Sequence, residues 1–380
     1  MIRILKLSFY YYQYLNYFYE NNDVNNLNYK EHQETLFKDR FGWSDSFKYS
    51  FEKNKNISVQ EIIVNDYQLQ KKWINENSKF FFNDKWQLEY LKKQIEFYKP
   101  NVIFVNNPSL NQSFYEMILS YKVRLITYDG ICSHNENLIN YSDIIISCLK
   151  STCDFYSKFN KKVFYMPHGF DRRILNNLSS NEIKNDSIFI GNIRNINHSK
   201  RVDLLNKVLS KTNIKIWIGD EKKNSQNSNL NKILNIKNLF INFKRINHII
   251  NIKKLFKKNN GQVYGMKMYN LLNQNKIILN NHIDNSRDEA ANIRLFEGTG
   301  VGSCLVTDFK KNIRNFFSED EIVLFKNYEE AVEKINYLSK NPKVAEEIAL
   351  RGMKKVQTKH LLEDRWNSLY EYLISQKEIS

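Results

Sequence analysis

The chain of 380 residues has few residues that break a regular backbone, with 11 glycines and four prolines. This scarcity excludes collagen-like, Pro-rich and Gly-rich low-complexity architectures. Hydrophobic residues make up 42% and charged residues 26%, which is typical of a folded globular protein rather than a disordered one. One core rarely supports a chain of this length, so we expect two domains.

Cysteine is equally scarce, since Cys132, Cys148, Cys153 and Cys304 are the only four. None forms a Cys-x-x-Cys pair, and no Cys/His cluster has the spacing of a zinc site. We therefore expect reduced thiols, as in a cytoplasmic protein, and no structural metal.

Long apolar runs are missing as well, because none reaches the roughly 18 residues that span a bilayer. The stretch 1–22 is apolar, but Lys6 and many tyrosines interrupt it and no small-residue cleavage site follows. This pattern predicts a first strand and helix rather than a signal peptide, so we expect a cytoplasmic location.

Acidic residues are outnumbered, 41 against 57 basic ones, which gives a net charge of +16. Two interpretations stay open: a lysine-rich surface that reflects codon usage, or an anionic partner such as a nucleotide, a phospholipid, an acidic glycan or nucleic acid. The basic residues form no terminal tail. No RNA-binding aromatic signature or helix-turn-helix pattern is found, so nucleic acid is not expected as a partner.

Short apolar runs with turn residues at their ends predict strands, and segments with helical periodicity separate most of them. The strands are expected at 2–10, 59–65, 101–107, 123–130, 143–149, 162–169, 186–192, 214–220, 276–282 and 303–308. The helices are expected at 13–20, 85–98, 201–211, 264–274, 291–300, 328–340, 342–357 and 362–375. Between them, the Asn- and Lys-rich stretch 221–236 predicts a surface loop. Alternation of this kind indicates β-α-β units and parallel sheets.

The alternation restarts near residue 180, which predicts two doubly wound, Rossmann-like α/β domains at 1–180 and 181–360. The closing helix at 361–380 is expected to return to the first domain. In such folds ligands bind beyond the carboxyl ends of the strands, so we expect a site in a cleft where the two domains face each other.

The stretch 292–308, NIRLFEGTGVGSCLVTD, contains three of the 11 glycines within five positions. One interpretation is a turn where the backbone comes close to a ligand. Glu297 could then accept two hydrogen bonds from the cis-diol of a ribose, with Arg294 one helical turn earlier on the same face. The alternative is a helix with a C-cap glycine and a tight turn into a strand.

The stretch NIRLFEGTGVGSCLVTDFKKNI resembles the helix-turn-strand signature of bacterial GT-B glycosyltransferases, and is closest to the CgeB-like or group 1 glycosyltransferases. The segment VYGMKMYNLLNQNKIILNNHID resembles the helix and strand that precede this signature. FFSEDEIVLFKNYEEAVEKINYLSKNPKVAEEIALRGMKKVQTKH resembles the C-terminal segment. FGWSDSFKYSF, VQEIIVNDYQLQKKW and MPHGFD are also similar to that family. The resemblance covers most of the chain and is strongest over 262–365.

This resemblance implies a GT-B enzyme that moves a sugar from a nucleotide-activated donor to an acceptor hydroxyl. The donor would bind the domain at 181–360 and the acceptor the domain at 1–180. The implied setting is cell-surface polysaccharide, lipopolysaccharide or protein glycosylation, with a glycan, lipid-linked or protein acceptor. A lipid-linked acceptor would bring the basic protein into peripheral contact with the anionic inner face of the membrane.

The resemblance also assigns donor-binding roles by position. Glu297 would bind the ribose, and the segment from Gly298 to Gly302, with Thr299 and Gly300, would shape the turn beside the donor. The further donor-binding residues would be Gly191, Tyr264, Gly265, Lys267, His282, Asn292 and Arg294.

No Asp-x-Asp occurs in the chain, so no metal and no other cofactor is expected at the diphosphate. Fixed cations would then stabilise the leaving group. Arg194, Lys200 and Arg201 follow the strand at 186–192, where relatives place an Arg/Lys pair on the diphosphate. The alternative interpretation of this run is a solvated helix start.

Catalytic candidates come from strand ends and from spacing. Asp129 and His168 each follow a predicted strand, where an inverting enzyme needs a general base near the acceptor. Glu289 precedes Glu297 by eight positions, a spacing that retaining relatives show, and would contact the donor sugar. The alternative for the first two is a turn or capping role, and for Glu289 a chance spacing.

Two other function classes stay open at this point. A non-catalytic nucleotide-sugar or glycan-binding protein would keep Glu297 without productive acceptor geometry. A nucleic-acid binder is motivated by the charge alone and would show steeply salt-dependent binding.

Overall fold

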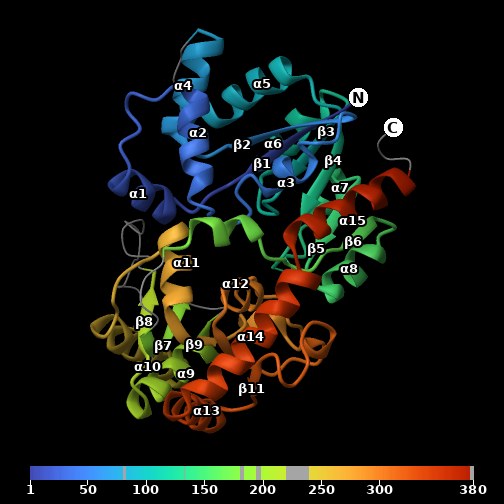
Figure 1. The fold of residues 1–380 in the computed structure, drawn as a ribbon. Helices are drawn as coiled ribbons and strands as arrows, with labels where there is room; N and C mark the ends of the chain where they lie inside the picture. Colours follow the sequence, from blue (N-terminus) through green and yellow to red (C-terminus); the bar gives the residue numbers. More distant parts are fainter. Residues whose placement is uncertain (80–82, 132, 180–183, 194–197, 220–238, 377–380) are drawn as a thin grey trace. The chain divides into compact units, whose positions relative to one another are not determined.

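The computed structural model describes the chain in the ranges 1–79, 83–131, 133–179, 184–193, 198–219 and 239–376, with the backbone alone at 184–185 and 239–247. The contacts divide the chain into two compact units (Figure 1). Unit 1 comprises Met1–Arg172 and His360–Ser380, and unit 2 comprises Arg173–Lys359.

Unit 1 is built on a six-stranded parallel sheet in the order β2-β1-β3-β4-β5-β6. Its strands are β1 Ile2–Ser8, β2 Ile57–Ile63, β3 Val102–Val105, β4 Arg124–Tyr128, β5 Ile144–Ser147 and β6 Lys162–Tyr165. Its helices are α1 Tyr12–Asn21, α2 Tyr29–Lys38, α3 Ser46–Phe51, α4 Tyr67–Asn77, α5 Trp86–Tyr98, α6 Gln112–Leu119, α7 Glu136–Tyr141, α8 Lys150–Ser157 and α15 Leu362–Ser375.

Both faces of this sheet are covered, which explains why its strands are continuous apolar runs. On one face Leu5 and Ile103 pack with Leu91 of α5 and Phe114 of α6. The interruption at Lys6 is also buried, and its Nζ pairs with Glu61 on the neighbouring strand at 2.6 Å.

The last helix, α15, belongs to unit 1, as expected from the sequence. Its Trp366 is fully buried, and its indole nitrogen donates to Ser46 Oγ at 3.1 Å. Trp43 and Phe47 meet the Trp366 ring edge-on, with centroids 4.9 and 5.1 Å away. The FGWSDSF motif therefore forms the surface of unit 1 on which α15 packs.

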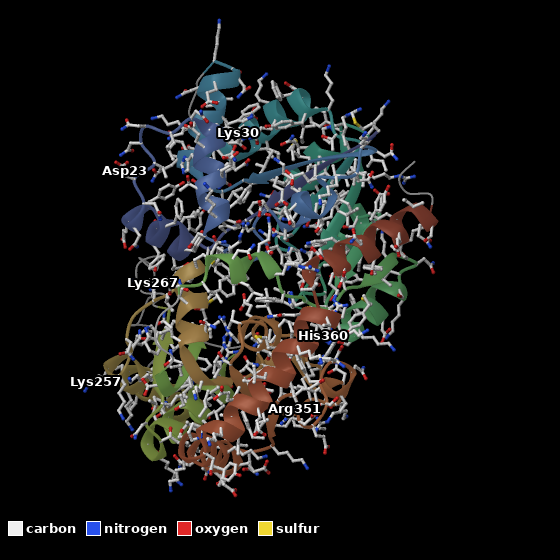
Figure 2. All side chains as sticks on the ribbon, in the orientation of Figure 1. Asp23, Lys30, Lys257, Lys267, Arg351 and His360 are labelled. Atoms are coloured by element: carbon white, nitrogen blue, oxygen red, sulfur yellow. The ribbon has the colours of Figure 1, made fainter. Side chains whose placement is uncertain are left out.

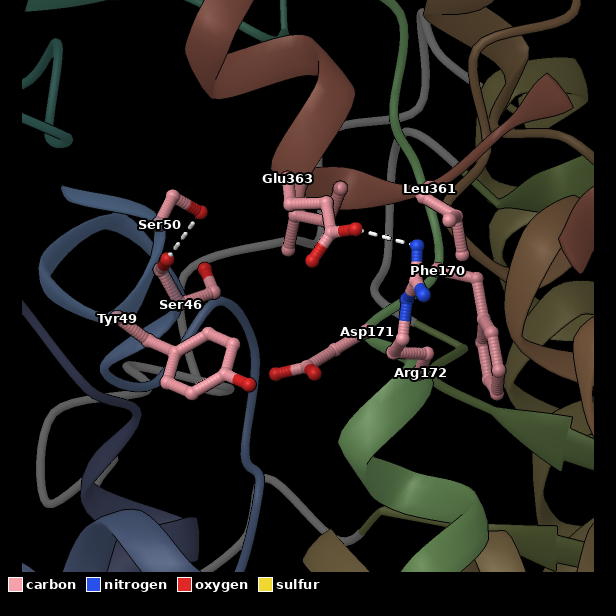
Figure 3. Close-up of a pocket in the computed structure, with 9 residues that line it drawn as sticks. Ser46, Tyr49, Ser50, Phe170, Asp171, Arg172, Leu361 and Glu363 are labelled. Atoms are coloured by element: carbon pink, nitrogen blue, oxygen red, sulfur yellow. Dashed lines mark hydrogen bonds and ion pairs between the residues drawn. The ribbon is translucent and has the colours of Figure 1, made fainter. Parts of the chain in front are cut away.

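A second motif, MPHGFD, holds the segment that enters α15. The Phe170 amide donates to the His360 carbonyl and the Leu362 amide donates to the Phe170 carbonyl, both at 2.9 Å. A Cβ on Gly169 would lie 2.8 Å from the Leu362 nitrogen, so only glycine fits. Figure 3 shows the adjoining open pocket of about 200 Å³, where Arg172 forms an ion pair with Glu363.

Unit 2 contains a five-stranded parallel sheet in the order β11-β10-β9-β7-β8. Its strands are β7 Lys184–Gly191, β8 Lys215–Ile218, β9 Asn275–Asn280, β10 Cys304–Asp308 and β11 Val323–Phe325. Its helices are α9 Ser199–Lys211, α10 Leu239–Lys257, α11 Gly265–Gln274, α12 Arg294–Gly300, α13 Tyr328–Lys340 and α14 Pro342–Lys359.

Helices also cover both faces of the second sheet. Ile277 and Val306 share one core with Val202 of α9, Leu255 of α10 and Ile335 of α13. Their neighbours in the strands, Ile278 and Leu305, face α12 instead: a Cβ at Gly298 of α12 would lie 3.1 Å from Ile278 Cδ1 and 3.4 Å from Leu305 Cδ1.

The α/β class with two parallel sheets is confirmed, and the expected strands are found with ends shifted by a few residues. The expected ranges do not include the helices α2, α3, α4, α6, α7 and α8, the backbone helix α10 and the three-residue strand β11. The predicted loop at 221–236 lies outside the described residues. Among the described residues, no helix combines the length and apolar character that a membrane span requires.

Candidate functional site

The strand order of unit 2 reverses at β7, which pairs with β8 on one side and β9 on the other. Such a reversal directs the connections that follow the two strands to opposite faces of the sheet. The carboxyl ends of β7 and β9 therefore mark the switch point where open parallel sheets bind ligands. Polar residues predicted from the sequence gather at this point.

Arg201, in the first turn of α9, bridges the two strand ends. Its Nη1 donates to the Asn192 carbonyl at 2.6 Å, and its Nη2 donates to the Asn281 carbonyl. Burial lowers the pKa of Arg201 to about 10, against the opposing influence of Asp308 and Asp284. The guanidinium is therefore charged at neutral pH, although the residue is only 5% exposed.

His282 follows β9 and is held by Asp308 at the end of β10. Both the backbone nitrogen and Nδ1 of His282 contact Asp308 Oδ1, at 2.9 and 2.8 Å. Burial opposes the charge on Asp308, but the contacts with His282 and nearby Lys310 outweigh it and lower the pKa of Asp308 to about 2. An ionised Asp308 fixes Nδ1 as a donor and leaves Nε2 for another partner.

Asparagine amides continue this network toward α12. Asn292 Nδ2 donates to Asn280 Oδ1 at 2.9 Å, and Asn280 Nδ2 donates to Thr307 Oγ1 at 3.0 Å. Asn292 Oδ1 accepts from the Arg294 amide at 2.8 Å. These bonds connect the end of β9 to the start of α12.

Glu297 is buried in α12 with its carboxylate between two neighbours. Its Oε1 accepts from Tyr269 Oη at 2.8 Å. Its Oε2 lies 2.8 Å from Arg294 Nη1, an ion pair without hydrogen-bond geometry. Since a carboxylate oxygen has two lone pairs, Oε2 can still accept a hydroxyl donor. Binding of a ribose by Glu297 stays a prediction.

Several atoms of this cluster are buried and lack a hydrogen-bond partner among the described residues. They are Arg201 Nε, Asn281 Oδ1, His282 Nε2 and Glu297 Oε2. Leaving such an atom unpaired costs about 1–3 kcal/mol, so native proteins rarely leave several together without a partner. Four from three neighbouring segments indicate a place where a polar ligand supplies the missing bonds.

The glycine-rich stretch forms the end of α12 and its C-cap. Gly298 and Gly300 lie inside α12, and Gly302 follows its C-cap with φ +90°. The Ser303 amide bonds the Gly298 carbonyl at 3.2 Å and the Gly302 amide bonds the Thr299 carbonyl at 3.0 Å, which is a Schellman cap. The expected turn beside the donor is thus a helix and its C-cap; Thr299 is fully buried inside it.

The start of α9 is capped by an acidic side chain of the chain itself. Asp284 Oδ2 accepts from the Ser199 amide at 3.0 Å and from Ser199 Oγ at 2.8 Å, and lies 3.4 Å from the Lys200 amide. A carboxylate of the chain itself therefore occupies the N-terminus of this helix. Lys200 has an exposed side chain, and Arg194 lies outside the described residues.

The other predicted donor residues are spread around unit 2. Gly191 ends β7 with Arg201 Nη1 3.8 Å from the position of a Cβ. Tyr264 is the N-cap of α11 and donates to Gln262 at 3.1 Å, and Gly265 follows with φ +54°. Lys267 is exposed on α11 (Figure 2). Glu289 is partly buried, with its amide bonded to the Ser286 carbonyl at 2.9 Å.

In unit 1, Asp129 follows β4 and is fully buried with its carboxylate surrounded by donors. Oδ1 accepts from the Ile131 amide at 3.1 Å, while Oδ2 accepts from the amide and hydroxyl of Ser133 and from Tyr156 Oη, each at 2.9 Å. These bonds hold the turn after β4, as in the capping alternative. A base role for Asp129 stays a prediction.

His168 lies after β6 and faces aromatic neighbours. Its Nε2 is 3.3 Å from Tyr128 Oη, and its buried Nδ1 has no hydrogen-bond partner among the described residues. Burial, with a smaller contribution from Arg365, lowers the pKa of His168 to about 4. The imidazole is neutral at physiological pH.

Neither residue lies at the switch point of unit 1, which is between β1 and β3. The residues that follow these strands interact there: the Phe9 amide donates to Asn106 Oδ1 at 3.2 Å. Next to them Tyr11 and Tyr12 are 49% and 52% exposed. Sequence reasoning missed this edge because no glycine-rich loop marks it.

Sequence reasoning also missed Asp308, Asn280, Asn281 and Tyr269 in unit 2. A signal for Asp308 existed, because it ends the predicted strand 303–308 next to β9 in a parallel sheet. Thr307 pairs with Asn280 in register, so residues after both strands meet at one edge. Among the described residues, no group of three or more His, Cys, Asp or Glu side chains is placed to hold a metal ion.

Comparison with protein families gives one match: residues 237–371 fit the family described as Glycosyl transferase-like. This part of the chain contains His282, Asn292, Arg294, Glu297 and Asp308. A sequence comparison with curated proteins gives no match.

Solved structures give matches over the whole chain. Anabaena HepE in complex with UDP-glucose is 10% identical, with a TM-score of 0.59 over 99% of this chain and all of that one. Sucrose-phosphate synthase from Thermosynechococcus elongatus is 10% identical, with a TM-score of 0.56 over 99% and 100%. UDP-GlcNAc 2-epimerase from Neisseria meningitidis, bound to UDP-GlcNAc, is 9% identical, with a TM-score of 0.52 over 98% and 100%. These similarities establish the two-domain GT-B fold.

Proposed function

We propose that the protein is a glycosyltransferase that binds a nucleotide-sugar donor at the β7/β9 switch point of unit 2. The observation that carries this proposal is the cluster of four buried polar atoms without a hydrogen-bond partner among the described residues, on Arg201, Asn281, His282 and Glu297. Three of these residues lie in the segment that matches the Glycosyl transferase-like family. Two of the similar structures are complexes with UDP-glucose and UDP-GlcNAc, which makes a sugar nucleotide the class of ligand to test.

The chemistry of the cluster suits the parts of such a donor. Arg201 is a fixed cation at the strand ends and would stabilise the charge that grows on the diphosphate as the glycosidic bond breaks. Glu297 Oε2 would accept from a ribose hydroxyl, and His282 Nε2 would bond a hydroxyl of the donor. Because Arg201 and Arg294 supply positive charge, the proposal requires no metal.

The finer assignments belong to the same proposal. They are the CgeB-like subgroup, transfer to a glycan, lipid-linked or protein hydroxyl, and a role in cell-surface glycan synthesis. Their support is the resemblance of the quoted motifs over 262–365.

A thermal-shift screen across UDP-, GDP-, CMP- and dTDP-sugars tests the site. One class of donor should raise the melting temperature of the wild type and leave Glu297→Gln unchanged. Glu333→Gln, an exposed glutamate on α13, is the matched control and should respond like the wild type. A donor that stabilises all three proteins equally would place the ligand away from Glu297.

Analysis of the products formed from the donor then distinguishes a transferase, an epimerase and a non-catalytic binding protein. A transferase releases the nucleoside diphosphate, slowly to water and faster with acceptor, and adding a chelator should not change the rate. An epimerase, which one similar structure is, would invert a stereocentre of the sugar, whereas a transferase joins the sugar to the acceptor. Tight binding with no product would identify the non-catalytic alternative.

A further inference from the structure

The positive charge of the chain is concentrated in one segment. Between Lys200 and Lys258 there are 15 basic and only three acidic residues, whereas the remainder has 42 basic and 38 acidic residues. This segment contains α9, β8 and α10. The net charge is therefore concentrated in this segment of the sequence, and lysine enrichment distributed evenly along the chain does not describe it.

The described end of α10 separates a packed face from an exposed basic one. Leu255 is fully buried in the core, and Ile252 and Phe256 pack against the same core. Lys253, Lys254, Lys257 and Lys258 are all exposed. Residues four apart lie on one side of a helix, so Lys253 and Lys257 form a row opposite the packed face, with Lys254 beside it. Lys258 follows directly after the end of α10. Figure 2 labels Lys257 on the outer side of this helix.

No acidic side chain in the described part of the chain neutralises these lysines. No carboxylate lies within 4.0 Å of any of the four among the described residues, and Lys258 contacts only the Leu209 carbonyl of α9, at 3.5 Å. Lys207 of α9 differs, because its Nζ lies 3.7 Å above the Tyr328 ring and Glu329 is near it. The α10 lysines thus form an uncompensated patch.

Two exposed isoleucines lie one helical turn before these lysines, on the same face of α10. Ile249 is 46% exposed and Ile250 is 43% exposed. They lie four residues before Lys253 and Lys254, so apolar and basic side chains share one surface. This combination suits an anionic bilayer, where lysines meet phosphate headgroups and isoleucines enter the boundary with the acyl chains. Nucleic acid would use the lysines but has no use for the isoleucines.

We propose that this surface, defined by Ile249, Ile250, Lys253, Lys254, Lys257 and Lys258, docks unit 2 on an anionic lipid bilayer. The contact goes beyond the donor site and does not depend on it. It would bring a donor-binding domain to a membrane where lipid-linked molecules are available.

Sedimentation with phosphatidylcholine vesicles, with and without phosphatidylglycerol, tests the surface. The wild type should bind only the phosphatidylglycerol vesicles, and added salt should weaken binding. The variant Lys253→Gln/Lys254→Gln/Lys257→Gln/Lys258→Gln should lose at least about tenfold in partitioning. The control Lys30→Gln/Lys38→Gln/Lys53→Gln/Lys55→Gln removes the same charge from exposed positions of unit 1 and should bind like the wild type.

Equal loss in both variants would overturn the proposal, because only total charge would then matter. Failure of the wild type to bind phosphatidylglycerol vesicles would overturn it as well, as would binding to a mixed-sequence DNA duplex in preference to vesicles. Ile249→Ser/Ile250→Ser should weaken vesicle binding severalfold without changing affinity for DNA; unchanged vesicle binding would refute the apolar part. Equal melting temperatures of all variants show that the fold is kept, and none of these assays requires donor or turnover.

Discussion

Two strand ends of this molecule carry a buried polar residue, and they differ in what surrounds it. After β4, Asp129 receives bonds from Ile131, Ser133 and Tyr156, so the protein itself satisfies the carboxylate. After β9, His282 is bonded through Nδ1 only, and its buried Nε2 has no hydrogen-bond partner among the described residues. Both residues are buried and polar and follow a strand, but of these two only His282 leaves bonding capacity for a ligand.

This difference predicts which substitutions damage the fold and which damage binding. A carboxylate that organises four donors contributes to stability, because its loss leaves those donors unpaired. A side chain with an unused buried atom contributes to ligand affinity instead. The predictions that follow take the two strand ends in turn.

Asp129→Asn has the largest expected effect. It removes the charge and one acceptor from a buried carboxylate, which should lower the free energy of unfolding by about 2–4 kcal/mol. Denaturant unfolding measures this loss, with Asp154→Asn, an exposed acid on α8, as the control. If the protein keeps its stability and loses turnover, Asp129 is a base and the comparison fails.

Arg201→Lys should act mainly on donor affinity, unlike Asp129→Asn, which acts on the free energy of unfolding. A lysine keeps the charge but cannot reach the Asn192 and Asn281 carbonyls together with a phosphate, so donor affinity should fall about 30-fold, or about 2 kcal/mol. Isothermal titration with the stabilising donor measures it. Arg351→Lys on α14, whose guanidinium is partly exposed beside Asp320, is the control and should bind normally. Normal affinity of Arg201→Lys would remove the diphosphate from this position.

His282→Asn compares the two ring nitrogens of one residue: Nδ1, which contacts Asp308, and Nε2, which has no hydrogen-bond partner among the described residues. Asparagine can keep a donor at the position of Nδ1 for Asp308, but it has no atom at the position of Nε2. Donor affinity should fall about tenfold while the melting temperature changes little, because an unused hydrogen-bonding atom is what has been removed. His282→Gln, which can place a polar atom near Nε2, should recover part of the affinity. Equal affinity in both variants would mean that Nε2 contacts no ligand.

His168 is the remaining candidate at a strand end, and the pH dependence of the free energy of unfolding tests it. His168→Gln should give the smallest effect. Burial lowers the pKa of His168 from 6.5 to about 4, so protonation favours the unfolded state as pH falls below 6.5. Between about pH 7.5 and about pH 6 the wild type should lose about 0.8 kcal/mol relative to the variant. Unfolding curves at both pH values give this difference. A constant difference would mean that the histidine titrates normally in the folded protein.

The parallel sheets could be predicted from the sequence because buried parallel strands are apolar runs between turns. The three-residue strand β11 is too short for such a pattern, and the apolar residues of α10 are spaced without a clear helical period. The three glycines near Glu297 were correctly placed at a helix end, where Gly298 packs against Ile278 and Gly302 forms the C-cap. Propensity and cap chemistry thus predict elements better than they predict which residues meet a ligand.

The polar cluster could be predicted only in part. Glu297, Arg294, Asn292, His282 and Arg201 were identified, and the structure connects them at one edge of the sheet. Whether a polar group is already satisfied depends on distant partners, such as Tyr156 for Asp129, 27 residues further along the chain. A single sequence does not indicate such pairs, and the same limit hid the bond between His282 and Asp308.

Hydrogen–deuterium exchange on the whole chain, with and without saturating nucleotide sugar, tests the central claim most directly. We predict slower exchange at the strand ends of unit 2, in peptides that contain 188–193, 279–283 and 292–298, and unchanged exchange at 128–133. Protection at 128–133 with none at the three unit 2 segments would contradict the claim that the donor binds at the β7/β9 switch point.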